Sequence, residues 1–195
     1  MTMLANITKK PSRAMPHRYR SGVIAVALAA SLLAAADTDP AARGAELLVP
    51  FKRDLLAALA DGLADGPAAA IDACRVRAPE IAAALSGDDV RVGRTSNRLR
   101  NPGNTGPDWA KPLLDAYLAD DSDRTPKLVR LADERYGYVE PIEAAPLCLS
   151  CHGETLAPAV ATRIAEAYPD DRATGYRAGD LRGIFWVEFA SDSMR

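Results

Sequence analysis

The sequence predicts an α+β domain in which helices come first and the strands of an antiparallel sheet come later. Two stretches with helical periodicity fill the region from residue 41 to about residue 85. Residues 90–96, 127–142 and 184–189 then show the patterns typical of strands. Because helices and strands do not alternate regularly along the chain, a parallel βαβ arrangement is not expected.

A long N-terminal helix is expected over residues 41–66, because leucines and a phenylalanine recur on one helical face. Pro50 lies within this pattern, where it either bends the helix or marks its start. A second helix is expected to begin at Pro67, since proline is favoured in the first helical turn. Its periodicity turns Cys74 inward, toward the rest of the domain.

The later elements are expected to form the sheet and its connections. In chain order they are a strand over residues 90–96, a long loop to Pro107, a short helix from Asp108, a hairpin over residues 127–142, a helix that ends before Pro169, and a closing strand. In the closing strand, Phe185, Val187 and Phe189 share one face. Ile184 and Trp186 are expected on the opposite face.

The first 36 residues have the three parts of a secretory signal peptide. Five basic side chains and no acidic one occur before residue 21, an apolar run follows over residues 22–33, and three alanines precede Asp37. The apolar run is short for a membrane span, which needs about 20 residues. We therefore expect cleavage after Ala36 and a single periplasmic domain over residues 37–195. An uncleaved segment would instead keep the protein in contact with the membrane.

Cleavage would change the charge of the protein. It would leave 19 basic against 26 acidic residues, a formal net charge of −7. An acidic domain is poorly suited to bind nucleic acid or an anionic membrane, so neither partner is expected. All three cysteines would remain, and an odd number leaves at least one thiol outside any disulfide.

The segment "APLCLSCHGETLAP" contains Cys148, Cys151 and His152 in the C-x-x-C-H spacing of c-type haem attachment. Residues three apart share a helical face, so both thiols can add to the two vinyl groups of one porphyrin. The adjacent histidine then supplies the proximal iron ligand. Haem is attached on the exported side of the membrane, where the signal segment places the chain. The two features together predict one covalent haem c.

Three alternatives explain the cysteine pair less well. A structural zinc ion needs four ligands, and beyond the motif the mature chain adds only Cys74. A redox dithiol is expected beside a strand-to-helix active site, which the neighbouring sequence does not show. A plain disulfide leaves His152, the single histidine of the mature chain, without a role.

The second axial ligand of the iron can be narrowed by elimination. His17 and three of the four methionines leave with the signal segment, and Met194 is next to last. Cys74, one of three lysines (52, 111 or 127), the new N-terminal amine, or an open site remain. We favour Cys74, whose alternative role is that of a small buried hydrophobic residue. A thiolate ligand would favour ferric iron and a low potential.

Four arginines lie close together in this otherwise acidic chain: Arg91, Arg94, Arg98 and Arg100. Arginine matches carboxylates through paired hydrogen bonds, so one or two of the four are expected to bind the haem propionates. Arg94 and Arg100 are the candidates, because they flank the turn-forming residues of this segment. The alternative is a solvated basic edge.

The stretches "GRTSNRLRNPGN", "APLCLSCHG" and "AYPDDRATGYRAGDLRGIFWVEF" resemble a family of small exported or sensor-attached c-type haem domains. The resemblance extends from Ala73 to the C-terminus, and its RNPxN and GYxxGDxRG segments are fairly specific. It implies a PAS-like antiparallel sheet with flanking helices and one covalent haem. It also implies a distal cysteine ligand from an early helix, at the position of Cys74.

Three functions fit a haem held in this way. The first is a periplasmic sensor, in which a diatomic gas or reduction displaces a thiolate opposite His152. The second is an electron carrier between periplasmic redox partners. The third is a small haem enzyme, and the sequence favours it least because no second histidine or acid–base pair lies near the motif. We therefore predict a sensor and assign no catalytic residue.

Overall fold

The computed structural model describes residues 39–120 and 122–194, and these form an α+β fold, as predicted. The helices are α1 (Pro40–Ala64), α2 (Pro67–Ala84), α3 (Lys111–Ala119), α4 (Leu149–His152) and α5 (Pro158–Ala167). The strands are β1 (Val90–Thr95), β2 (Lys127–Arg130), β3 (Arg135–Glu143) and β4 (Leu181–Ala190). The strands form one antiparallel sheet in the order β1-β4-β3-β2. The predicted signal segment lies outside the described residues.

The long N-terminal helix is confirmed, and it runs through Pro50 without a break. It begins at Pro40, where the side chain of Asp39 accepts a hydrogen bond from the Ala41 backbone at 3.1 Å. Pro50 therefore does not mark the start of α1. The second helix begins at Pro67, as predicted. Within the described residues, no helix is long and apolar enough to cross a membrane.

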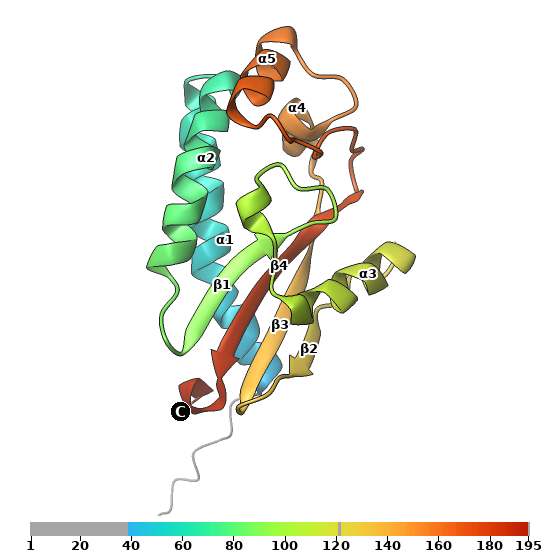
Figure 1. Ribbon diagram of the computed structural model, residues 1–195. Helices are drawn as coiled ribbons and strands as arrows, with labels where there is room; N and C mark the ends of the chain where they lie inside the picture. Colours follow the sequence, from blue (N-terminus) through green and yellow to red (C-terminus); the bar gives the residue numbers. More distant parts are fainter. Residues whose placement is uncertain (1–38, 121, 195) are drawn as a thin grey trace, which may run out of the picture. The chain divides into compact units, whose positions relative to one another are not determined.

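The central strand β4 divides the core into two apolar layers. Val187 and Phe189 are fully buried and pack against Leu48 and Phe51 of α1. On the opposite face, Ile184 and Trp186 pack against Ala110, Leu114 and Tyr117, which belong to α3 and the turn before it. The division of the closing strand into two faces is therefore confirmed. Figure 1 shows α1 running behind the sheet, α2 beside β1, and α3 in front of the sheet.

The first two helices extend beyond one end of the sheet, where α2 contacts α4 and α5. At the other end, α1 approaches the sheet so closely that a Cβ on Gly44 would lie 2.5 Å from the Tyr138 ring. Helix α2 pairs with α5 through Asp72 and Arg163, whose Nε donates at 2.9 Å. Helix α4 lies near α2 and α5 in the upper part of Figure 1. This end of the molecule holds the candidate site.

Candidate functional site

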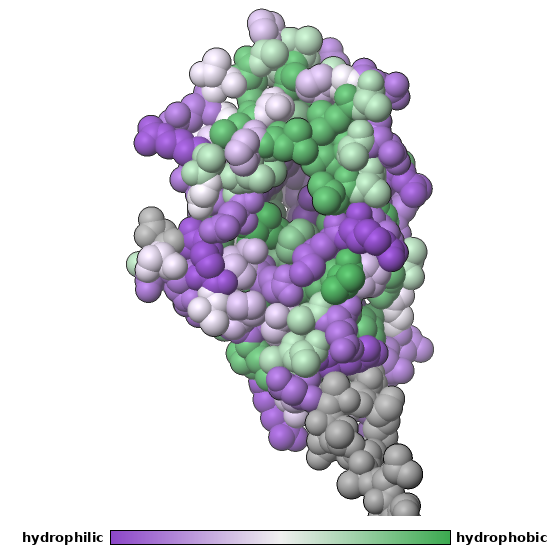
Figure 2. All heavy atoms as spheres, turned by 180° about the vertical axis from the view of Figure 1, so that it is seen from behind, coloured by the Kyte–Doolittle hydropathy of each residue, from purple (hydrophilic) through white to green (hydrophobic). Residues whose placement is uncertain are grey.

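A cavity of about 1200 Å³, part of it open to solvent, lies between α2, the segment after β1, and the C-x-x-C-H segment. Apolar side chains from α1 and α2 make up much of its lining: Leu59, Leu63, Ala70, Ile71 and Ala78. Figure 2 shows apolar side chains gathered in the upper part of one face, where the surface is hollowed. A largely apolar cavity with a few polar groups is typical of a small-molecule or cofactor site.

The C-x-x-C-H residues line this cavity together. Cys148 ends a turn of 3₁₀ helix, and Cys151 and His152 lie in the single-turn helix α4 that follows. Because residues three apart share a face of a helical turn, both thiols line the cavity, as the spacing predicts. All three cysteines are free thiols, so the structure shows no disulfide between them. No group of three or more His, Cys, Asp or Glu side chains in the described residues is arranged to hold a metal ion without a cofactor.

The His152 ring is held in one tautomer. Its Nδ1 lies 2.6 Å from the carbonyl oxygen of Ala173, and because a carbonyl only accepts, Nδ1 carries the proton and donates it. The lone pair is then on Nε2, which is the arrangement that a metal-ligating histidine requires. Burial, reinforced by the nearby cations of Arg182 and Arg100, lowers the pKa of His152 to about 2. The imidazole is therefore neutral at physiological pH.

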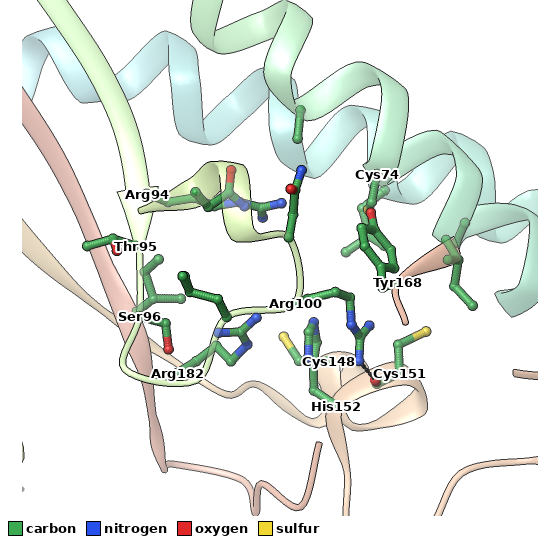
Figure 3. A pocket seen from close by; sticks show the side chains of 18 of the residues that line it. Cys74, Arg94, Thr95, Ser96, Arg100, Cys148, Cys151, His152, Tyr168 and Arg182 are labelled. Carbon is green, nitrogen blue, oxygen red and sulfur yellow. Dashed lines mark hydrogen bonds between the residues drawn. The ribbon is translucent and has the colours of Figure 1, made fainter. Parts of the chain in front are cut away.

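Cys74 lies on α2 and lines the same cavity. Figure 3 shows Cys74 on the side opposite His152, with the space of the cavity between them. Burial raises the pKa of the Cys74 thiol, and the positive charges of Arg94 and Arg100 act in the opposite direction. The inward orientation expected from the helix pattern is thus observed.

The three lysines left open as iron ligands lie elsewhere. Lys52 pairs with Glu140 at 2.5 Å, Lys111 pairs with Asp115, and Lys127 pairs with Asp123. None of these lysines lines the cavity. Of the side chains considered as the second iron ligand, Cys74 is the one that lines the cavity within the described residues.

Arg100 joins the loop after β1 to the backbone around the motif. Its guanidinium forms an ion pair with Asp171 at 3.1 Å, and both side chains are about nine-tenths buried, with 11% and 9% exposed. The same guanidinium donates to the carbonyl oxygens of Cys151 at 2.5 Å and Ala173 at 3.4 Å. The predicted pairing of Arg100 with a haem propionate stays a prediction. In the structure this guanidinium already has a carboxylate partner, Asp171.

Arg94 and Arg182 also line the cavity but have no carboxylate partner. Neither side chain forms a hydrogen bond or an ion pair with another described residue. Burial lowers the pKa of both guanidiniums, that of Arg182 to about 10. The arginine cluster predicts a role for Arg94, whereas no such pattern predicts one for Arg182. The sequence feature that points to Arg182 is the GYxxGDxRG segment, which contains it.

The Arg100–Asp171 pair yields a stability prediction. Asp171→Asn removes the charge that compensates Arg100, and breaking a buried ion pair in this way costs about 3 kcal/mol. We expect urea unfolding of the purified protein to show a lower midpoint with an unchanged slope. The matched control is Asp54→Asn, which breaks the exposed pair with Arg53 and should leave the midpoint nearly unchanged. Equal midpoints for wild type and Asp171→Asn would contradict the role given to this pair.

Comparisons with known proteins show the family and the fold of this chain. The chain matches the sequence profile of the family described as Tll0287-like over residues 9–190. Its fold is similar to that in the crystal structure of the cyanobacterial haem protein Tll0287, with a TM-score of 0.51 and 23% sequence identity. That match covers 75% of this chain and 91% of the cyanobacterial one. Among curated proteins, none matches this chain. Because the profile spans most of the sequence, the chain belongs to the Tll0287-like family.

Proposed function

We propose that this protein binds one haem c in the cavity, as an exported sensor of redox state or of a diatomic gas. The observation that carries the proposal is the convergence of Cys74 with Cys148, Cys151 and His152 on one largely apolar cavity. In this arrangement Cys148 and Cys151 would attach the haem, and His152 and Cys74 would hold its iron. Membership of a family whose solved relative is a haem protein supports the proposal.

The residues of the cavity fit a haem in three respects. The Ala173 carbonyl fixes His152 in the ligating tautomer. Apolar side chains of α1 and α2 provide a surface for a porphyrin and exclude water. Unpaired arginines line the same cavity and would complement the haem carboxylates. A bound haem supplies one-electron redox chemistry and, where a ligand position opens, affinity for diatomic gases.

The sensor function rests on which elements the two axial ligands come from. His152 ends α4, whereas Cys74 is in the middle of α2, and the two helices are connected by a long stretch of chain. Ligation by both residues would tie α2 to the motif through the iron. Release of Cys74 by a gas or by reduction would break this tie and allow α2 to shift against α4. A ligand-dependent change between two helices is the kind of two-state element that sensing requires.

An electron carrier is the second candidate, and one observation favours it. Leu147, next to Cys148 at the cavity, has 52% of its surface exposed. An exposed apolar residue beside the attachment site would allow close approach of a periplasmic redox partner. In a carrier, both axial ligands would remain in place during reduction.

Covalent attachment is tested with the full chain expressed together with a c-type haem maturation system. We expect the purified protein to give the haemochrome band of haem c in alkaline pyridine and to keep its haem on a denaturing gel. The double variant Cys148→Ala/Cys151→Ala should lose the gel-stable haem, whereas Cys74→Ser should retain it. A wild-type protein without covalent haem would overturn the proposed function.

The distal ligand is tested by spectroscopy of Cys74→Ser. Because a thiolate shapes the ferric spectrum, we expect this variant to shift the Soret band and to alter the near-infrared charge-transfer bands. Lys52→Ala is the matched control, since Lys52 pairs with Glu140 away from the cavity. Its spectrum should equal that of the wild type. A Cys74→Ser spectrum identical to the wild type would exclude Cys74 as the ligand.

Carbon monoxide separates the sensor from the carrier. We expect the reduced wild-type protein to take up carbon monoxide readily and to change its visible spectrum, because the gas replaces Cys74. Cys74→Ser should bind carbon monoxide at least as fast. Unchanged six-coordinate bands in the reduced wild type, together with fast electron exchange, would support the carrier instead.

A further inference from the structure

The cavity lining contains positive charges that no carboxylate of the lining balances. Three guanidiniums line it, those of Arg94, Arg100 and Arg182, and none of the described lining residues is acidic. Asp171 compensates only Arg100, from outside the lining. Burying a cation without a counter-charge is unfavourable. Two cations are therefore left for a ligand that brings two negative charges.

Arg182 is the more unusual of these two arginines. It follows Leu181 at the start of β4, and its Nε is buried without a hydrogen-bond partner. Its guanidinium carbon lies 5.3 Å from the centre of the Tyr176 ring. Arg98 lies over the same ring at 4.3 Å, so two cations stabilise the ring's position. Tyr176 therefore orients Arg182 but offers it no anionic partner.

Arg94 and Arg182 occupy the same part of the cavity. Their strands are neighbours in the sheet, where Arg94 of β1 pairs with Phe185 of β4. In Figure 3 both side chains lie on the side of β1, while Cys151 and Tyr168 lie on the other side. A haem carries its two carboxylates on the pyrrole rings opposite those that bear the vinyl groups. Thioether bonds to the motif would therefore direct the carboxylates away from the attachment edge.

We propose that Arg94 and Arg182 form the dicarboxylate-binding end of the cavity, each pairing with one haem propionate, while Arg100 braces the protein. This inference rests on the proposed function and adds Arg182 to the site. It also separates the arginines by task. Arg100, which already has a carboxylate partner, joins two segments of the chain. Arg94 and Arg182, which have none, bind the propionates.

The first test uses the holoprotein and its resonance Raman spectrum. We expect Arg182→Gln to keep the covalent haem and the haemochrome band while the propionate bending band shifts, and Arg182→Lys to restore part of the shift. Arg91→Gln is the matched control, because the Arg91 side chain is exposed and does not line the cavity. Its propionate band should stay in place. An unshifted band in Arg182→Gln with haem attached would overturn this inference and leave the proposed function intact.

If Arg182→Gln fails to fold or to retain haem, a second measurement tests the inference. The full-chain double variant Cys148→Ala/Cys151→Ala keeps the arginines and is titrated with ferric haem and with ferric haem dimethyl ester. We expect the free dicarboxylate to bind at least about 10-fold more tightly, as one charge-assisted hydrogen bond would provide. Equal affinities would overturn the inference. A wild-type protein that carries no haem would overturn the proposed function and this inference with it.

Discussion

The site depends on one buried ion pair. Arg100 and Asp171 bring the loop after β1 and the loop before β4 against the backbone of the C-x-x-C-H turn. Asp171 also accepts a hydrogen bond from the Ala173 backbone at 2.9 Å, and the Ala173 carbonyl in turn orients His152. A short helix of a single turn has little stability of its own. Its geometry is therefore set by these contacts from distant parts of the chain.

The sheet determines where those distant parts meet. Strand β4 pairs with both β1 and β3, so the loops that follow β1 and β3 and the loop that precedes β4 all leave the sheet at the same end. A parallel bridge between Gly153 and Tyr176, with backbone hydrogen bonds from Tyr176 to His152 and from Gly175 to Gly153, joins two of these loops. The apolar layers on both faces of β4 hold the frame rigid. The site is thus formed by loops, and the sheet holds the ends of these loops together.

Local patterns predicted the local features of this protein. The α+β class, both long helices and the two faces of β4 follow from periodicity, which records which side of an element is buried. The C-x-x-C-H spacing likewise predicted that Cys148, Cys151 and His152 lie together, because they are near neighbours in sequence, and the structure places all three along one cavity. The partners of Arg100 and the unpaired state of Arg182 could not be predicted in this way. Asp171 lies 71 residues from Arg100, and only the folded chain shows which arginine its carboxylate reaches.

The course of α1 has a practical consequence. The helix begins beside the C-terminal turn, to which it packs, and contributes to the cavity lining only with Leu59 and Leu63. At 1.5 Å per residue, this places the lining about 30 Å along α1 from Pro40. Both ends of the described chain therefore lie at the far end of the sheet from the cavity (Figure 1). An affinity tag or an electrode linker attached at either end would leave the cavity accessible to small molecules.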